Sequence, residues 1–155
     1  MRITDPLKRR RLWNRVKKGW EEDGLQVPGG ATREKITAFE QRYAITMPDD
    51  LREYFLTTDG NGEVWGSDYF QFWPLEEVKL VSEELNDVHK DRHDYPGCFV
   101  FADYFDWSWA YAVQLAVDRR ASGPVYIIDG HARRIVAGSF VEFMTGYADD
   151  SNGLY

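Results

Sequence analysis

GATREKITAFEQRYAITMPDDLREYFLTTDGNG, residues 30–62, decides the fold class, because it places two capped helices in front of a glycine turn. Thr32 stands where an N-cap is needed, since its hydroxyl can accept a hydrogen bond from a free amide of the first turn. Ile36, Phe39 and Tyr43 follow at spacings of three and four residues, which puts them on one helix face. The first half of the stretch therefore predicts an amphipathic helix.

The second half predicts a further helix and a chain reversal. Pro48 suits a helix start, and acidic residues fill the first turn, where the helix dipole favours negative charge. Leu51, Tyr54 and Phe55 form the apolar face of this helix. The helix ends at TTDGNG, residues 57–62, whose glycines can adopt the positive φ that such a turn requires.

A basic helix precedes this stretch. An Asp-Pro pair at residues 5–6 predicts its start, and an acidic run followed by a Gly/Pro-rich linker at residues 24–31 predicts its end. We expect its apolar stripe of Trp13, Val16 and Trp20 to pack on the protein, because each exposed indole would leave on the order of 200 Å² unburied. The alternatives are contact with an anionic membrane and binding of nucleic acid.

Beyond the glycine turn, the pattern changes from a helical to an alternating period. Short strands are predicted at residues 64–65, 69–73, 99–102, 111–117, 125–128 and 134–137. The strict alternation at residues 111–117 indicates a half-buried strand. Helices are predicted at residues 74–85 and 139–146, the second opened by a Ser-x-x-Glu capping box.

This order of elements predicts an α+β protein with a mostly antiparallel central sheet flanked by helices. We expect a basic N-terminal helical arm at residues 1–24 and a single domain at residues 25–155. No internal repeat interrupts the second segment.

Charge is distributed unevenly along the 155 residues. The formal net charge is −7, yet residues 1–18 carry eight basic residues and one acidic residue. The remaining residues carry 11 basic and 25 acidic side chains. A strongly acidic body disfavours nucleic acid as a direct ligand and favours a basic protein partner through long-range attraction.

Several features point to a cytoplasmic protein without membrane contact. No apolar run approaches the ~18–20 residues that span a bilayer, and the N-terminus has no apolar core of a secretory signal. The single cysteine, Cys98, excludes an intrachain disulfide. Because Cys98 flanks a predicted strand, we interpret it as a small buried apolar residue.

The sequence lacks the common catalytic signatures, including the P-loop, GxGxxG, HExxH and GxSxG. His89 and His93 have the i, i+4 spacing of a zinc site, but their stretch is polar and ends in Tyr-Pro-Gly, which indicates a solvated connection. Asp103 and Asp106 could serve acid–base chemistry, although solvated loop acids beside core aromatics explain the pair better. We therefore expect no catalytic residue, no metal and no cofactor.

Acidic residues alternate with tryptophan and tyrosine in two places downstream of the glycine turn. The candidate partner-binding residues are Glu63, Trp65, Asp68, Tyr69, Asp103, Asp106, Trp107 and Trp109. Aromatic side chains supply contact area and carboxylates select a basic partner, so the combination is typical of a protein-binding surface. Ordinary core packing of the same aromatics is the alternative.

The order of these motifs resembles the SUKH superfamily from Gly30 to about Tyr147. The matching residues of the opening stretch are Gly30, Ile36, Phe39, Glu40, Met47, Pro48, Asp49, Tyr54, Phe55, Gly60, Asn61 and Gly62. FWPLEEV, FVFADYF, PVYIID and SFVEFM, which begin at residues 72, 99, 124 and 139, continue the order. Met47 replaces the commoner Leu, and Thr-Asp-Gly at residues 58–60 departs from the usual Asn-Gly.

The resemblance implies an α+β fold with a central sheet and a role as a binding protein. Bacterial members resemble immunity proteins that neutralise delivered toxins, many of them nucleases, in the cytoplasm; a fungal branch resembles regulators of cell-wall glucan synthesis. The superfamily has no shared catalytic motif. Together with the charge, the resemblance predicts a non-enzymatic immunity protein against a basic toxin domain, with a nuclease as the expected class. The alternative is a regulatory or scaffold protein with an endogenous partner.

Overall fold

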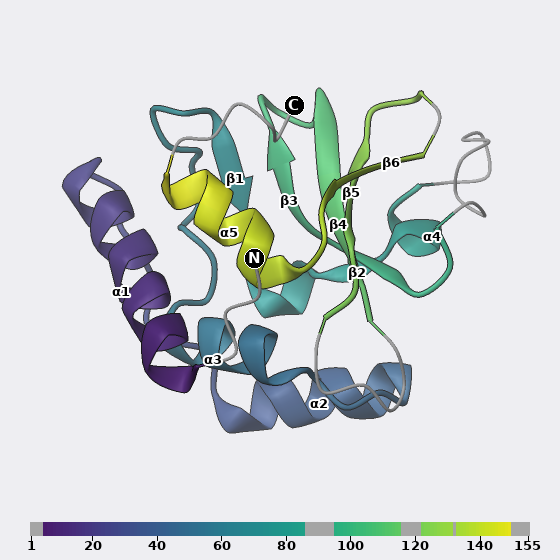
Figure 1. The fold of residues 1–155 in the computed structure, drawn as a ribbon, viewed down its shortest axis with the longest axis horizontal. Helices are drawn as coiled ribbons and strands as arrows, with labels where there is room; N and C mark the ends of the chain where they lie inside the picture. The colour runs from purple at the N-terminus through teal and green to yellow at the C-terminus, as the bar shows by residue number, and fades with distance from the viewer. Residues whose placement is uncertain (1–4, 86–94, 116–121, 132, 150–155) are drawn as a thin grey trace.

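A computed structural model describes residues 5–85, 95–115, 122–131 and 133–149 of the chain (Figure 1). Its elements are α1 (Pro6–Glu22), α2 (Arg33–Tyr43), α3 (Asp49–Thr57), β1 (Phe70–Phe72), the 3₁₀ turn η1 (Leu75–Glu77), β2 (Lys79–Leu80), α4 (Val81–Glu84), β3 (Cys98–Tyr104), β4 (Trp109–Gln114), β5 (Val125–Ile128), β6 (Arg134–Ala137) and α5 (Phe140–Ala148). Three helices come first, a run of strands interrupted by η1 and α4 follows, and α5 comes last, which confirms the predicted α+β fold and its N-terminal helix.

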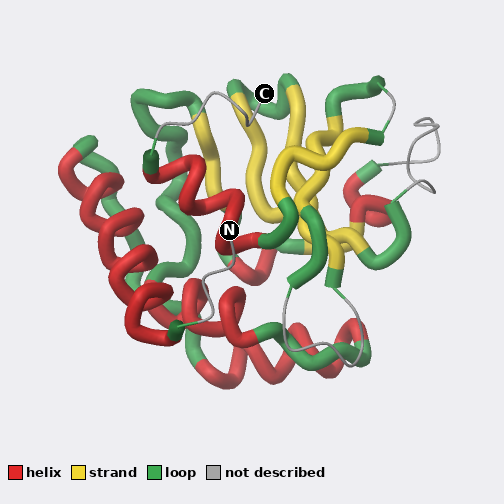
Figure 2. Tube along the Cα trace, viewed as in Figure 1, coloured by secondary structure: helices red, strands yellow, loops and turns green. Residues whose placement is uncertain are grey.

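The strands form one antiparallel sheet in the order β1-β3-β4-β5-β6. β1 and β2 share one edge of β3, with Phe70 opposite Tyr104 and Leu80 opposite Phe99. Figure 2 shows the strands as one layer, with α1 and α5 beside it and α2 and α3 along the lower end of the view. From β3 to β6 each strand pairs with the next one in the chain, and every pairing is antiparallel, as predicted.

The helix starts follow the residues that the sequence indicates. Asp5, Thr32 and Ser139 each accept a hydrogen bond from a first-turn amide, while Pro48 precedes α3. The carboxylate of Glu142 accepts from the Gly138 amide at 2.8 Å rather than from Ser139, so the predicted capping box is shifted by one residue on that side. α5 then continues to Ala148, two residues beyond the predicted end.

α1 packs into the core through its tryptophan stripe. The ring of Trp13 lies 5.4 Å from that of Tyr54 in α3 and 5.6 Å from that of Phe140 in α5. Trp20 lies 5.1 Å from Phe72 of β1. Both indoles are almost fully buried, which confirms that the helix packs on the rest of the protein.

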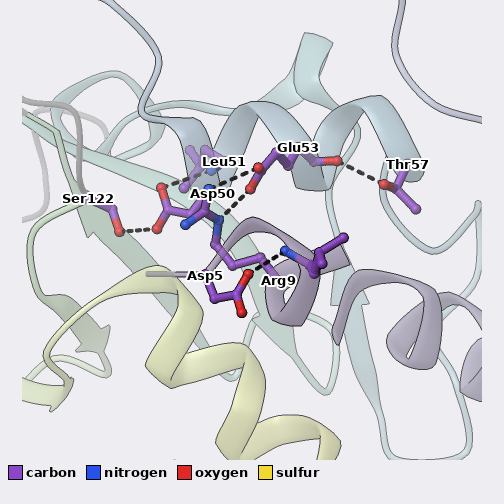
Figure 3. Close-up of polar contacts among 8 residues, drawn as sticks. Asp5, Arg9, Asp50, Leu51, Glu53, Thr57 and Ser122 are labelled. Carbon is purple, nitrogen blue, oxygen red and sulfur yellow. Dashed lines mark hydrogen bonds and ion pairs between the residues drawn. The ribbon is translucent and has the colours of Figure 1, made fainter. Parts of the chain in front are cut away.

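Polar contacts also join α1 to α3, and α3 to the segment before β5 (Figure 3). The Arg9 guanidinium donates two hydrogen bonds to the Glu53 carboxylate, at 2.6 and 3.0 Å. The buried Asp50 carboxylate accepts from the Ser122 hydroxyl at 2.7 Å and from the Leu51 amide at 2.9 Å. Burial raises the pKa of Asp50 above its ordinary value. The bidentate pair ties α1 to α3, and Asp50 ties α3 to the segment before β5.

Two predicted elements are wrong. Residues 64–65 form no strand and belong to an irregular loop, because the edge of β3 pairs only as far as Phe70 opposite Tyr104. The predicted helix at residues 74–85 is divided into η1, β2 and α4. It is interrupted because Lys79 and Leu80 pair with β3 instead of continuing the helix.

The alternating strand at residues 111–117 is described as far as Leu115, and its predicted half-burial is wrong. Ala110 and Ala112 are as fully buried as Tyr111, so β4 is covered on both faces. One cover is α5, whose Phe143 ring lies 4.9 Å from that of Tyr111. The second face of β4 carries small alanines, so large and small side chains alternate in the sequence although both faces are buried.

Candidate protein-binding surface

Two loops meet at one end of β1 and β3 and expose apolar side chains there. Residues 61–69 precede β1, and the β3–β4 turn follows Tyr104, whose pairing with Phe70 sets the loops side by side. Of the seven exposed large apolar side chains in the described ranges, four lie here: Val64, Trp65, Tyr69 and Phe105, exposed by 64, 39, 45 and 51%. Such a concentration, unlike scattered apolar residues, is typical of an interaction site.

The rings of these loops form a continuous row, which we call the aromatic patch: Trp65, Phe105, Tyr69, Tyr104 and Trp109. Trp65 stacks on Phe105 with the centroids 6.0 Å apart, and Tyr69 meets the same ring edge-on at 5.2 Å. Tyr69 contacts Tyr104 at 6.2 Å, and Tyr104 stacks on Trp109 at 4.3 Å. Each ring is therefore oriented by a neighbour, which lowers the entropy lost when a partner covers it.

The backbone under the patch adopts conformations that side chains rarely tolerate. Tyr69, Phe105, Asp106 and Trp107 have positive φ angles of 68°, 47°, 52° and 65°. Each costs about 1–2 kcal/mol for a residue with a Cβ. The Phe105 amide donates to the Tyr69 carbonyl at 2.9 Å, which joins the two strained loops. Strain of this kind is concentrated at functional sites, where the surroundings hold it in place.

Three of the candidate carboxylates lie on the surface at this corner. Glu63, Asp68 and Asp106 are exposed. Asp68 also accepts hydrogen bonds from the Phe70 amide, at 3.0 Å, and from the Tyr147 hydroxyl. The structure thus brings exposed acids and exposed aromatic rings together from both predicted groups.

Asp103 and Trp107 lie differently from the other candidates. Asp103 is buried; one carboxylate oxygen accepts from Trp73 Nε1 at 2.7 Å and the other from the Trp107 amide at 3.1 Å. Burial raises its pKa. The half-buried Trp107 donates its Nε1–H to Glu84 at 2.9 Å. These two side chains shape the turn beneath the patch rather than presenting a charge to a partner.

A groove of about 1170 Å³ adjoins the patch, and we call it the acidic groove. It runs between the linker after α1 and the segment from Trp73 to Lys79. Its lining includes five carboxylates: Asp59, Glu63, Glu77, Glu84 and Asp103. Lys79 also lines it and pairs with Glu84 at 3.2 Å. Glu63 and Val64 belong to the lining and precede Trp65 directly, so the groove and the patch are continuous.

A family model described as SMI1 / KNR4 family (SUKH-1) matches residues 30–146, which is most of the chain. The chain belongs to this family. The match covers both loops of the aromatic patch, while α1 lies before it. The SMI1/KNR4 family belongs to a group of protein-binding modules that includes immunity proteins and regulators. No curated protein matches the chain.

Phe105 and Tyr104 are the members of the patch that sequence reasoning missed. From the sequence alone, the aromatic residues between Asp103 and Asp106 are interpreted as core residues, although Phe105 lies beyond the end of β3 and is exposed. The signal that could have found Phe105 is the run Tyr-Phe-Asp-Trp-Ser-Trp between two strands. Aromatic residues in a hairpin turn have no sheet face to pack on, so some of them become exposed.

The remaining candidate residues of the sequence analysis are Cys98, His89 and His93. Cys98 is buried as predicted, and burial raises the pKa of its thiol to about 11. His89 and His93 lie outside the described residues. In the part of the chain that the structure describes, no three His, Cys, Asp or Glu side chains are grouped to hold a metal ion. Within the same ranges, none of the helices has the length and apolar character to cross a bilayer.

Proposed function

We propose that this family member is a non-enzymatic immunity protein of the cytoplasm, which binds a basic toxin domain, in the first instance a nuclease, through the aromatic patch and the acidic groove. The observation that supports this most directly is the concentration of exposed Trp65, Tyr69 and Phe105 beside exposed carboxylates. Aromatic anchors surrounded by polar residues are the usual arrangement of an interface that binds strongly.

Electrostatics favour the same class of partner. Residues 19–155 carry 14 more acidic than basic side chains, and the groove next to the patch presents the exposed carboxylates of Glu63 and Glu77. A nuclease cleft is positively charged because it must hold phosphates, and a carboxylate-rich surface is complementary to it. Long-range attraction would raise the association rate, while the desolvated aromatic rings would slow dissociation.

The disposition of the carboxylates supports binding over catalysis. Asp103, the buried acid nearest to Asp106 in sequence, has both oxygens engaged by Trp73 and Trp107. A general base must instead present a free oxygen within hydrogen-bond reach of a substrate. We therefore infer that Asp103 keeps the turn in shape and that the surface serves as a docking site.

The test is capture of toxin domains encoded beside the gene, followed by affinity measurement at low and moderate salt. We expect Trp65→Ala and Phe105→Ala each to weaken binding by more than about 10-fold. Ile135→Ala is the matched control, because Ile135 is 55% exposed on β6 and should not alter the affinity. Asp106→Lys should lower the association rate, most strongly at low salt.

Two results would contradict the proposal. One is that none of the neighbouring toxin domains binds or is inhibited by the purified chain. The other is that the patch variants bind as tightly as the Ile135→Ala control, which would place the interface elsewhere.

The alternative is a regulatory or scaffold protein that binds an endogenous partner, since the family also includes regulators. The exposed cations of α1 support it as a second contact surface. Lys8, Arg10 and Arg11 are exposed there and oppose the charge of the body. Capture of an endogenous regulator that is lost in Arg10→Glu/Arg11→Glu but kept in Phe105→Ala would favour this alternative.

A further inference from the structure

The loop that carries Trp65 and Tyr69 lies against the ends of α1 and α5, at the upper left of Figure 1. Asp23, the residue that ends α1, accepts a hydrogen bond from the Ser67 amide at 2.7 Å. Gly66 allows this approach, because a Cβ there would stand 2.8 Å from the Asp23 carboxylate. The end of α1 therefore holds the middle of the loop directly.

A second contact that fixes the position of the loop comes from α5. The Tyr147 hydroxyl donates to Asp68 and accepts from Trp20 Nε1, the latter at 2.8 Å. Its ring packs edge-on against Phe70 and Phe72, with centroids 5.0 and 4.8 Å away, so the position of the hydroxyl is set by the core. The chain Trp20–Tyr147–Asp68 thus connects the core face of α1 to the loop, three residues after Trp65 and next to Tyr69.

Asp68 connects the Tyr147 hydroxyl to the backbone of the patch. Its second oxygen accepts from the Phe70 amide at 3.0 Å, and Tyr69 lies between them with a φ of 68°. The Tyr69 carbonyl in turn accepts from the Phe105 amide at 2.9 Å. A loop held at Ser67 and Asp68 therefore keeps the strained Tyr69 in the conformation that contacts Phe105.

Trp20 and Asp23 lie before the family match, which begins at residue 30, and Tyr147 lies just after its end at residue 146. We propose that Trp20, Asp23 and Tyr147 are positioning residues: parts of the chain outside the family-matched region hold the loop of the aromatic patch ready for its partner. This inference rests on the proposed function, because it assigns these residues a role in the same surface. It makes α1 a component of the binding apparatus rather than a separate arm.

Hydrogen exchange of the free protein tests the positioning without any partner. Asp23→Ala removes one hold, and Tyr147→Phe removes the hydroxyl while keeping the ring in the core. We expect amide exchange at residues 66–70 to rise by about 10-fold or more in each variant, while exchange in β4 and β5 stays unchanged. Arg15→Ala is the matched control, because it also removes a bond between α1 and the end of α5, to the Ala148 carbonyl and the Asp149 carboxylate, but Arg15 makes no bond to residues 66–70.

The conservative variant and an NMR titration separate positioning from general stability. Asp23→Asn keeps an oxygen that can accept from Ser67, so it should restore most of the protection that Asp23→Ala loses. In the wild type, the Ser67 amide resonance should shift with the ionisation of Asp23, whose pKa is lowered by the hydrogen bonds from Ser67. An Arg15→Ala protein should show the same shift.

Affinity for the captured toxin domain completes the test. We expect Asp23→Ala and Tyr147→Phe to weaken binding by about 5- to 10-fold, since a loosened loop must be ordered on binding. Unchanged exchange at residues 66–70 would overturn the inference. A looser loop with wild-type affinity, while Trp65→Ala still loses binding, would also overturn it but leave the proposed function standing. If Trp65→Ala and Phe105→Ala bind normally, the proposed function fails and the inference falls with it.

Discussion

Replacement of Trp13 tests whether α1 is a structural part of the protein. The side chain is 1% exposed and packs between Tyr54 and Phe140, so truncation would leave a cavity at the junction of three helices. Trp→Ala changes in such surroundings cost about 3–5 kcal/mol of unfolding free energy. This is a large share of the ~5–15 kcal/mol that stabilises a typical domain.

The indole nitrogen makes a second, sharper comparison possible. Trp13 Nε1 is buried and has no hydrogen-bond partner among the residues that the structure describes. A buried donor left unpaired costs about 1–3 kcal/mol. Trp13→Phe removes that donor, and the loss of ring volume costs on the order of 1 kcal/mol. The two effects offset each other, so we expect Trp13→Phe to lie within about 1 kcal/mol of the wild type.

Urea unfolding followed by far-UV circular dichroism measures both variants against the wild type. At constant m value, the shift in the urea midpoint gives the difference in unfolding free energy. In a separate thermal unfolding experiment, Trp13→Ala should lower the melting temperature by roughly 6–20 °C. Near-equal losses for Trp13→Phe and Trp13→Ala would refute the unpaired indole. A loss below about 1 kcal/mol for Trp13→Ala would refute the packing of α1.

Three further predictions follow from the same contacts. Deletion of residues 1–24 should abolish cooperative unfolding, because it uncovers Phe72 and Phe140; a cooperative, native-like product would instead support the predicted division into an arm and a domain at residues 25–155. Burial raises the pKa of the Cys98 thiol to about 11, so little reactive thiolate is present at pH 8. Mass spectrometry should show that iodoacetamide modifies Cys98 about 100-fold more slowly in the folded than in the urea-unfolded protein. Equal rates would contradict the burial of Cys98. Burial raises the pKa of Asp50, so the folded state favours the protonated carboxyl, and the wild type loses this contribution to stability as the pH rises through the folded pKa. Asp50→Asn has no such group, so its unfolding free energy in urea should rise relative to that of the wild type between about pH 3 and pH 6. A difference that stays constant over this range would refute the raised pKa.

Local patterns were sufficient for most of the fold. The caps at Asp5, Thr32 and Ser139 are short-range features, since a side chain needs only the next turn of its own helix to satisfy an amide. The helix predicted at residues 74–85 shows the limit of this logic. Its amphipathic spacing is real, yet pairing of Lys79 and Leu80 with β3 prevails, because strand contacts made at long range outweigh a weak local propensity.

The candidate site was predicted in part. Trp65 and Tyr69 were chosen for their residue types, and the structure places them in contact with Phe105, which was not chosen. Asp103 has the same composition signal as Asp106, but a buried indole N–H from Trp73 engages it. Asp106 is exposed, while Asp103 is buried and bonded to Trp73, which lies 30 residues away in sequence. A local sequence pattern does not contain such a neighbour.

The sequence by itself determined the α+β class, the helix starts at Asp5, Thr32 and Ser139, and the opposite charges of the first 18 residues and the rest. It favoured burial of the Trp13 and Trp20 stripe, which the structure then confirmed. These properties depend on periodicity, caps and composition, which act over one or two turns of chain. Only the tertiary structure decided that residues 61–69 and the β3–β4 turn meet in one aromatic patch and that α1 and α5 hold it from behind. Pairing of Phe70 with Tyr104 and the bonds of Asp23 and Tyr147 to the loop join segments far apart in sequence, and a local sequence pattern contains no information on such contacts.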